Sequence, residues 1–295
     1  MISRIRYLSA LVFFSITSFT CAQTDQESLN DLKQRIVHLN KLSKDSLGYA
    51  ITKAYQYASE AFRLADSIQY QKGLIDSKIR LAKYYSGTTK YSKCIQCLFD
   101  ALKIAERNNF IEEKMLIFDL LGYEYIHIQK YDQAQRFFDQ AMSLFSKTSD
   151  YNVKAQIFID IGRLKYITGK FSQALTHFYL ALSLSDSITK PTVIVNTYRG
   201  LGTVFYYQKK YPWALYYFNL ALKECRKNNL MNPLGSIYTL IAHVYHQNDD
   251  PIQSLNFNKK AQKVRAHNKQ WNHLASSFVN IGSLYLELGQ LDSAY

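Results

Sequence analysis

The strongest constraint in this chain is a ladder of glycines spaced 40 residues apart, at Gly122, Gly162, Gly202 and Gly282. Ala242 occupies the one missing position of the ladder. Alanines recur 12 and 19 residues after these positions, as Ala134, Ala174, Ala214 and Ala294, and as Ala141, Ala181, Ala221 and Ala261. Small residues at fixed offsets indicate closely packed helices, so we predict one helical unit that is repeated along the chain.

The residues between these small positions have the periodicity of two amphipathic helices per unit. Apolar residues recur at helical spacing in segments 115–128 and 131–145, and a short polar break separates the two segments. All four prolines are expected at helix boundaries, Pro212 and Pro251 at the start of second helices and Pro191 and Pro233 in loops before first helices. No alternating segment of strand length is bounded by turn signals, so the predicted fold class is all-α.

The same pattern continues toward the N-terminus. Small, aromatic and leucine residues occupy the equivalent positions there: Ala54, Ala58, Ala61, Ala82, Tyr85, Tyr91, Cys94, Leu98 and Ala101. This gives six units and a truncated seventh. A chain of 295 residues would ordinarily suggest about two globular domains. The unbroken period instead predicts one solenoid over residues 23–295, in which each helix pair completes its core on the next pair.

Each unit places aromatic, leucine or isoleucine, glycine and alanine residues in a fixed order. One copy reads Phe118, Leu121, Gly122, Tyr125, Ala134, Phe138 and Ala141. This order resembles the tetratricopeptide repeat, from roughly residue 27 to the end of the chain. The resemblance implies a right-handed superhelical solenoid of helix-turn-helix repeats. The chain departs from the family in its period, which exceeds the usual ~34 residues, and in lacking the proline expected after the last alanine. We expect the extra residues at the end of the second helix and in the loop between repeats.

The two ends of the chain carry separate expectations. Arg4 and Arg6 precede an apolar run that is too short to span a bilayer, which predicts a signal peptide over residues 1–22. The chain would then be exported, and either periplasmic or membrane-associated and facing the periplasm. Cys21 leaves a rival reading open, a lipoprotein acylated at that cysteine. The seventh unit would start its second helix at Leu291 and stop at Tyr295, so we expect the protein to continue beyond residue 295.

The net charge of +13 raises the question of nucleic-acid binding. Basic residues gather in the turns within the repeats, at Lys130, Lys170, Lys209 and Lys210, and a signal peptide would take the chain away from cytoplasmic nucleic acid. We therefore expect no nucleic-acid partner for this segment. An acidic peptide, a glycan or a membrane surface stays open as a partner.

The sequence contains no motif that indicates catalysis, a cofactor or a metal. Cys94 and Cys97 form a CxxC pair, but Cys94 occupies a small packing position, and there is no second pair to complete a zinc site. His243 and His246 could share one helix face without further metal ligands nearby in the sequence. No nucleophile elbow, phosphate-binding loop or dinucleotide-binding glycine pattern occurs. We expect this segment not to be an enzyme.

The resemblance also indicates where a ligand would bind. In tetratricopeptide arrays the first helices line the concave face, and five positions of each repeat point toward it. The corresponding residues are Asp119, Tyr123, Arg163, Tyr166, Asn196, Arg199, Tyr206, Tyr207, His243 and His246. Arginines and tyrosines in such a groove could hold a carboxylate and an apolar or sugar face. The carboxylate clamp of chaperone-binding members is not reproduced, since its positions hold Ile159 and Arg163, or Arg199 and Thr203.

These observations favour a scaffold that binds a protein or a peptide. Long-period arrays behind a signal peptide resemble the extracytoplasmic input segments of bacterial signal-transduction proteins, whose outputs are histidine kinases or transcriptional regulators. A membrane partner would enter only through a downstream span or a lipidated Cys21. The alternative is a periplasmic or lipid-anchored structural adaptor that assembles an envelope complex.

Overall fold

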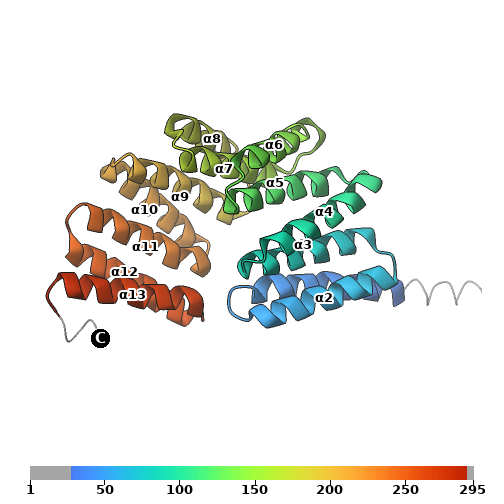
Figure 1. Cartoon of the computed structure of the whole chain (residues 1–295), viewed down its shortest axis with the longest axis horizontal. Helices are drawn as coiled ribbons and strands as arrows, with labels where there is room; N and C mark the ends of the chain where they lie inside the picture. The colour runs from blue at the N-terminus through green and yellow to red at the C-terminus, as the bar shows by residue number, and fades with distance from the viewer. Residues whose placement is uncertain (1–27, 291–295) are drawn as a thin grey trace, which may run out of the picture. The chain divides into compact units, whose positions relative to one another are not determined.

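The structure is a computed structural model, and it describes residues 28–290 (Figure 1). A helix runs through residues 28–46. The α-helices that follow are α2 (Ile51–Ser67), α3 (Gln71–Gly87), α4 (Tyr91–Arg107), α5 (Ile111–His127), α6 (Tyr131–Met142), α7 (Tyr151–Ile167), α8 (Phe171–Ser183), α9 (Pro191–Tyr207), α10 (Tyr211–Lys227), α11 (Met231–Gln247), α12 (Pro251–His267) and α13 (Trp271–Glu287). Short 3-10 helices, η1 (Phe145–Lys147) and η2 (Ser185–Ser187), follow α6 and α8. Residues 28–290 contain no strand, so the expected all-α class is confirmed.

The helices from α3 onward begin every 20 residues, which is half of the repeat seen in the sequence. Most of the turns that follow the helices from α2 to α13 pass through one residue in the left-handed region. These residues are Gln69, Thr89, Asn109, Gln129, Gly169, Lys209, Asn229, Asp249, Lys269 and Gly289. The conformation reverses the chain after a 17-residue helix, so the two helices of a pair run back alongside each other.

Each such turn closes the preceding helix with paired backbone hydrogen bonds. At the end of α5 the amide of Gln129 donates to the carbonyl of Ile126 at 3.0 Å, and the amide of Lys130 donates to that of Tyr125 at 2.9 Å. These bonds satisfy carbonyls that the helix end would otherwise leave without a partner. The left-handed residue is therefore part of the cap.

The turns after α6 and α8 differ. Both helices end early in a 3-10 turn, and an extended stretch leads into the next helix. Asp150 caps α7, because its Oδ1 accepts hydrogen bonds from the amides of Asn152 at 3.0 Å and Val153 at 3.2 Å. The extra residues of the long repeat thus lie at the end of the second helix and in the following loop in these two repeats, as expected from the sequence.

The chain divides into two compact units at Asn108 and Asn109. In the N-terminal unit, the helix at 28–46 and α2 to α4 share a core that contains Ile36, Ala61 and Leu74. A buried hydrogen bond at 3.2 Å, from Asn40 Nδ2 to Ser77 Oγ, joins the first helix to α3. This unit therefore has the paired, stacked arrangement predicted for the repeats.

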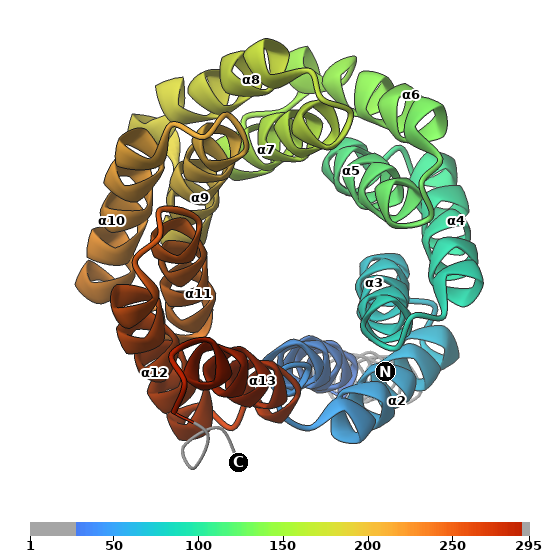
Figure 2. The ribbon, with the colours of Figure 1, turned by 60° about the vertical axis from the view of Figure 1, so that its left-hand side comes forward.

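The C-terminal unit contains α5 to α13. Figure 2 shows α5, α7, α9, α11 and α13 along the inner side of this unit and α6, α8, α10 and α12 along its outer side. Phe138, Phe178 and Phe218 on outer helices are at most 1% exposed. An added Cβ at the glycine of the same repeat, Gly122, Gly162 or Gly202, would approach the ring to between 2.5 and 3.0 Å. The recurring glycines are therefore the positions against which these rings pack.

The repeat count is confirmed by six consecutive helix pairs, from residue 28 to α12, followed by α13. The prediction for two prolines was wrong. Pro191 is the first residue of α9 and Pro233 is the third residue of α11. Proline is tolerated there because the N–H groups of the first helical turn have no carbonyl partner within the helix. The predicted signal peptide at 1–22, Cys21 and the segment from Leu291 to Tyr295 lie outside the described residues. Among the described helices, none is both long and apolar enough for a membrane span.

Candidate functional site: a cationic groove on the inner helices

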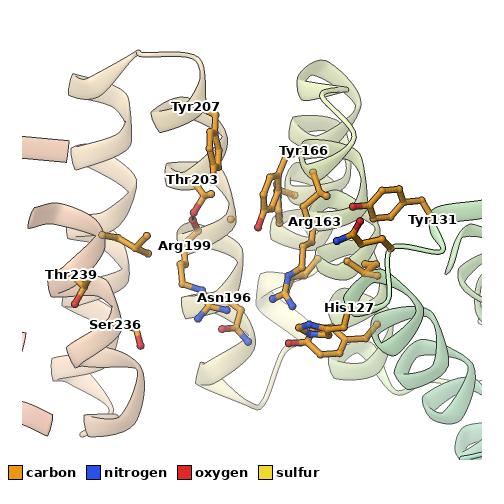
Figure 3. A pocket seen from close by; sticks show the side chains of 18 of the residues that line it. His127, Tyr131, Arg163, Tyr166, Asn196, Arg199, Thr203, Tyr207, Ser236 and Thr239 are labelled. Atoms are coloured by element: carbon orange, nitrogen blue, oxygen red, sulfur yellow. Dashed lines mark hydrogen bonds between the residues drawn. The ribbon is translucent and has the colours of Figure 1, made fainter. Parts of the chain in front are cut away.

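A groove of about 730 Å³ lies on the inner side of the C-terminal unit (Figure 3). Four consecutive repeats contribute to its walls, mainly through α5, α7, α9 and α11. Its polar and aromatic lining consists of Tyr123, His127, Gln129, Tyr131, Arg163, Tyr166, Asn196, Arg199, Thr203, Tyr207, Ser236, Thr239 and Arg265. We call this the central groove. Its lining is cationic as well as aromatic.

Arg163 is held in place from two helices. Its Nη1 lies 3.6 Å from Oδ1 of Asp160, one turn earlier on α7. Its guanidinium carbon lies 4.8 Å from the ring centre of Tyr123 on α5, in a cation–π contact. Asp160 is itself buried, and its Oδ2 accepts a hydrogen bond from Gln156 Nε2 at 2.6 Å. The guanidinium group is therefore oriented before a ligand arrives.

Burial and neighbouring groups shift the pKa values of Asp160 and Arg163. Burial raises the pKa of the Asp160 carboxyl, while Arg163 and the hydrogen bond from Gln156 act in the opposite direction. Burial by itself would lower the pKa of Arg163, but Asp160 and Tyr123 outweigh it and raise that pKa. Arg163 is therefore a firmly charged cation whose counter-charge lies behind it.

Arg199 extends from α9 into the same groove as Arg163 (Figure 3). Burial lowers the pKa of Arg199, and the positive charge of Arg163 lowers it further. No carboxylate of the described residues lies within ion-pair distance of Arg199. Arginine stays protonated in proteins, so Arg199 carries a positive charge that Asp160 offsets only from a distance. Asn196 and Thr203, one turn to either side, line the same wall.

A third arginine reaches the groove from the outer layer. Arg265 on α12 is only 6% exposed and passes close to Gly235 of α11. Its Nη1 donates to Ser277 Oγ at 2.6 Å and to the carbonyl of His273 at 3.2 Å, while its Nε has no hydrogen-bond partner. Burial lowers the pKa of this side chain too.

Aromatic rings flank the arginines. Tyr166 of α7 and Tyr207 of α9 stack with their ring centres 5.9 Å apart. Tyr123 and His127 of α5 meet edge to face at 4.7 Å. Burial raises the pKa of Tyr166, so its hydroxyl stays neutral and able to donate a hydrogen bond. The rings supply flat apolar surface beside the cationic centre.

The structure brings six of the ten predicted groove residues into the central groove: Tyr123, Arg163, Tyr166, Asn196, Arg199 and Tyr207. Asp119 is 3% exposed on α5 and does not line it. Tyr206 is half-buried and packs toward Tyr211, with ring centres 6.3 Å apart. His243 and His246 line a separate cavity of about 210 Å³ between α11 and α13. There His246 Nε2 lies 3.0 Å from an oxygen of Glu287.

Several lining residues were not predicted from the sequence, although the repeat would have found most of them. Ser236 and Thr239 lie one repeat after Asn196 and Arg199, displaced by 40 residues. His127 lies two repeats before Tyr207, displaced by 80 residues. Arg265 and Asp160 have no such signal. Arg265 belongs to an outer helix, and Asp160 supports the groove from behind without lining it.

The cysteine pair lies in the N-terminal unit and does not line the central groove. Cys94 is buried in α4, as its small packing position predicted, and Cys97 is half-buried on the same helix. Burial raises the pKa of the Cys97 thiol. Within residues 28–290, no cluster of His, Cys, Asp and Glu side chains has the arrangement of a metal site.

Comparison with known proteins agrees with this architecture. A family model described as tetratricopeptide repeat matches residues 115–187. No curated protein sequence matches the chain.

Several solved structures have a similar fold. NprR in complex with its cognate peptide NprX has a TM-score of 0.65 at 12% identity, with 88% of this chain and 74% of that chain covered. A Rap protein complexed with competence and sporulation factor has a TM-score of 0.61 at 14% identity, covering 90% and 73%. A signal transduction ATPase with a tetratricopeptide repeat sensor from Pyrococcus horikoshii has a TM-score of 0.58 at 16% identity. The match covers 86% of this chain but 43% of that one.

The sequence order, the stacked helix pairs, the family match and these structures agree. Residues 115–187 match the tetratricopeptide repeat, and the described part of the chain has the helical-repeat fold of these solved structures.

Proposed function

We propose that this chain is a protein- or peptide-binding scaffold and that the central groove receives the ligand. The observation that supports this most strongly is the groove itself, about 730 Å³ in volume and lined by side chains from four repeats. Ligand sites in proteins usually occupy some 300–1,000 Å³. Two of the similar structures, NprR and Rap, are complexes with a cognate peptide and with competence and sporulation factor.

The lining is suited to an extended peptide. Asn196 and Ser236 can each donate and accept hydrogen bonds, which the amides and carbonyls of a peptide main chain require. Thr239 donates its hydroxyl to the carbonyl of Gly235 at 3.2 Å and can still accept a hydrogen bond. The stacked rings of Tyr166 and Tyr207 can cover an apolar side chain. A peptide could thus be held by its main chain and by one or two of its side chains.

We further propose that the chain is the extracytoplasmic input segment of a bacterial signal-transduction protein, either a histidine kinase or a transcriptional regulator. Each repeat contacts only its neighbours, so a ligand bridging four repeats would change the angles between them, and these changes would add along the array. The alternative is a periplasmic or lipid-anchored adaptor that assembles an envelope complex. Acylation of Cys21 in the native protein would favour the adaptor.

The binding function can be tested with the full chain immobilised and exposed to a pool of short random peptides, with retained peptides identified by mass spectrometry. Thr203→Trp would fill the groove from the wall of α9 and should abolish retention. Thr176→Trp is the matched control, because Thr176 is exposed on α8 and does not line the groove. Equal retention by both variants would exclude the groove as the site, and no retention by the wild-type chain would refute peptide binding.

The cellular role is tested by reading the gene past the codon for Tyr295. An apolar run of about 20 residues, followed by a kinase or DNA-binding pattern, is the expected result for a membrane-bound sensor. A stop codon after one or two further repeats would refute the sensor and leave the adaptor.

A further inference from the structure

The charges that face the central groove are all of one sign. Three arginines and one histidine line it, and no aspartate or glutamate does. The nearby acid, Asp160, is buried beneath the surface of α7, where Arg163 and Gln156 engage it. A ligand in the groove therefore meets guanidinium groups without competing carboxylates.

Asp160 neutralises only part of this charge. Its Oδ1 faces Arg163 at 3.6 Å, beyond hydrogen-bond distance, and its Oδ2 is taken by Gln156. It therefore acts as a positioning residue for Arg163, together with the ring of Tyr123 beneath the guanidinium. Arg163 itself lines the central groove.

Arg199 and Arg265 add further positive charge, of which Asp160 offsets only part, from a distance, at Arg199. Arg163 and Arg199 point into the groove from adjacent inner helices, as Figure 3 shows, and repel each other there. Arg265 is buried with its Nε unsatisfied, and a buried cation without a counter-ion is costly. An anion in the groove would relieve both the repulsion and the unbalanced charge.

We propose that the central groove recognises a carboxylate of a peptide between the guanidinium groups of Arg163 and Arg199. Guanidinium groups bind carboxylates through paired, charge-assisted hydrogen bonds. The tyrosine rings of α7 and α9 then contact the adjoining part of the peptide. This inference rests on the proposed function of the groove as a peptide site. The carboxylate is either the C-terminus of the peptide or the side chain of an aspartate or glutamate.

Four pools of short synthetic peptides can distinguish a C-terminal carboxylate from a side-chain carboxylate. The pools combine a free or an amidated C-terminus with the presence or absence of aspartate and glutamate, and each is applied to the full immobilised chain. We expect retention of the pools that carry a carboxylate and none of the amidated pool that lacks acidic residues. Whichever single-carboxylate pool is retained identifies the source.

Arginine variants then link retention to the proposed contact. Arg199→Gln should weaken the binding of a retained peptide at least about tenfold, since one partner of a charged pair is lost. Arg199→Lys should recover part of that loss, because it restores the charge without the paired donors. Lys223→Gln removes the same charge from the exposed face of α10 and should change nothing. Circular dichroism checks that each variant is folded.

The outcomes distinguish this inference from the function on which it rests. Equal retention of the neutral pool, still blocked by Thr203→Trp, would overturn carboxylate recognition and leave the peptide site standing. Unchanged binding in Arg199→Gln would do the same. If no pool is retained, the peptide function fails and carboxylate recognition fails with it.

Discussion

The ring of Phe178 on α8 lies so close to Gly200 on α9 that an added Cβ at position 200 would come within 2.1 Å of the ring. The same ring faces Gly162 on α7, where an added Cβ would be 3.0 Å away. Phe178 is 1% exposed. The ring of Phe178 thus packs against two glycines on consecutive inner helices. Phe178 and Gly200 also line the central groove.

Gly200→Ala should therefore lower the free energy of unfolding by about 1–3 kcal/mol, because the buried ring or the backbone of α9 must move. Urea denaturation of both proteins measures the difference. Gly87→Ala is the control: Gly87 is exposed at the end of α3, and its Cβ would meet only Ile51 Cδ1 at 3.9 Å. The control should be as stable as the wild type or more stable. A Gly200→Ala variant of wild-type stability would show that Phe178 can shift freely.

This contact marks the limit of what the sequence could predict about the fold. The 40-residue ladder identified Gly162 and its ring, because both belong to one repeat and recur at fixed offsets. Gly200 stands outside the ladder, and its contact with Phe178 depends on how closely α9 packs against α8. That distance depends on the packing between repeats, which a pattern within one repeat does not encode.

The site was predictable to a similar extent. Positions that face the inner side recur with the repeat, so the resemblance to the tetratricopeptide family could place Arg163 and Arg199 in the groove. Asp119 occupies the same position as Arg199 two repeats earlier but is buried. Arg265 enters from an outer helix because Gly235 leaves room beside it. The burial of Asp119 and the entry of Arg265 from an outer helix depend on how the helices pack in three dimensions. Residue spacing along the sequence does not reveal either.

Lys209 should lower the stability of the fold, because it lies in the turn between α9 and α10 with a φ of 58°, which is unfavourable for a residue other than glycine. Lys209→Gly should raise the free energy of unfolding by about 1 kcal/mol, whereas Lys209→Ala should leave it nearly unchanged. In the preceding repeat, Gly169 has a φ of 76° with nothing within 4 Å of an added Cβ. Gly169→Lys should cost a similar amount. Thermal unfolding of the three variants tests this, and a Lys209→Gly variant that gains nothing would contradict it.

Asp160 should make the stability of the C-terminal unit depend on pH. Burial raises the pKa of Asp160 in the folded protein, so the folded state holds this proton more tightly than the unfolded state does. Stability is then greatest below the unfolded pKa of about 4 and is lost as the pH rises through the higher folded value.

Asp160→Asn removes this titration. We therefore expect the wild type to be less stable relative to Asp160→Asn at pH 7 than at pH 4, because the pH rises above the unfolded pKa of about 4 between these two measurements. Unfolding free energies from urea titrations at both pH values give the comparison. Asp132→Asn, an exposed carboxylate at the start of α6, is the control and should not reproduce the change. A difference between wild type and Asp160→Asn that is constant with pH would sink the prediction.

Ser277 should be essential for the attachment of α13 to α12. Its Oγ accepts a hydrogen bond from Arg265 Nη1 at 2.6 Å, and both side chains are buried. Ser277→Ala would leave a buried guanidinium short of an acceptor, at a cost of about 1.5–3 kcal/mol. Because α13 packs on α12 at one end of the described chain, the loss should appear as faster hydrogen exchange of the α13 amides, while α9 and α10 keep their protection. Ser276→Ala, an exposed neighbour on the same helix, should exchange like the wild type. Equal protection of α13 in both variants would mean that packing alone holds this helix.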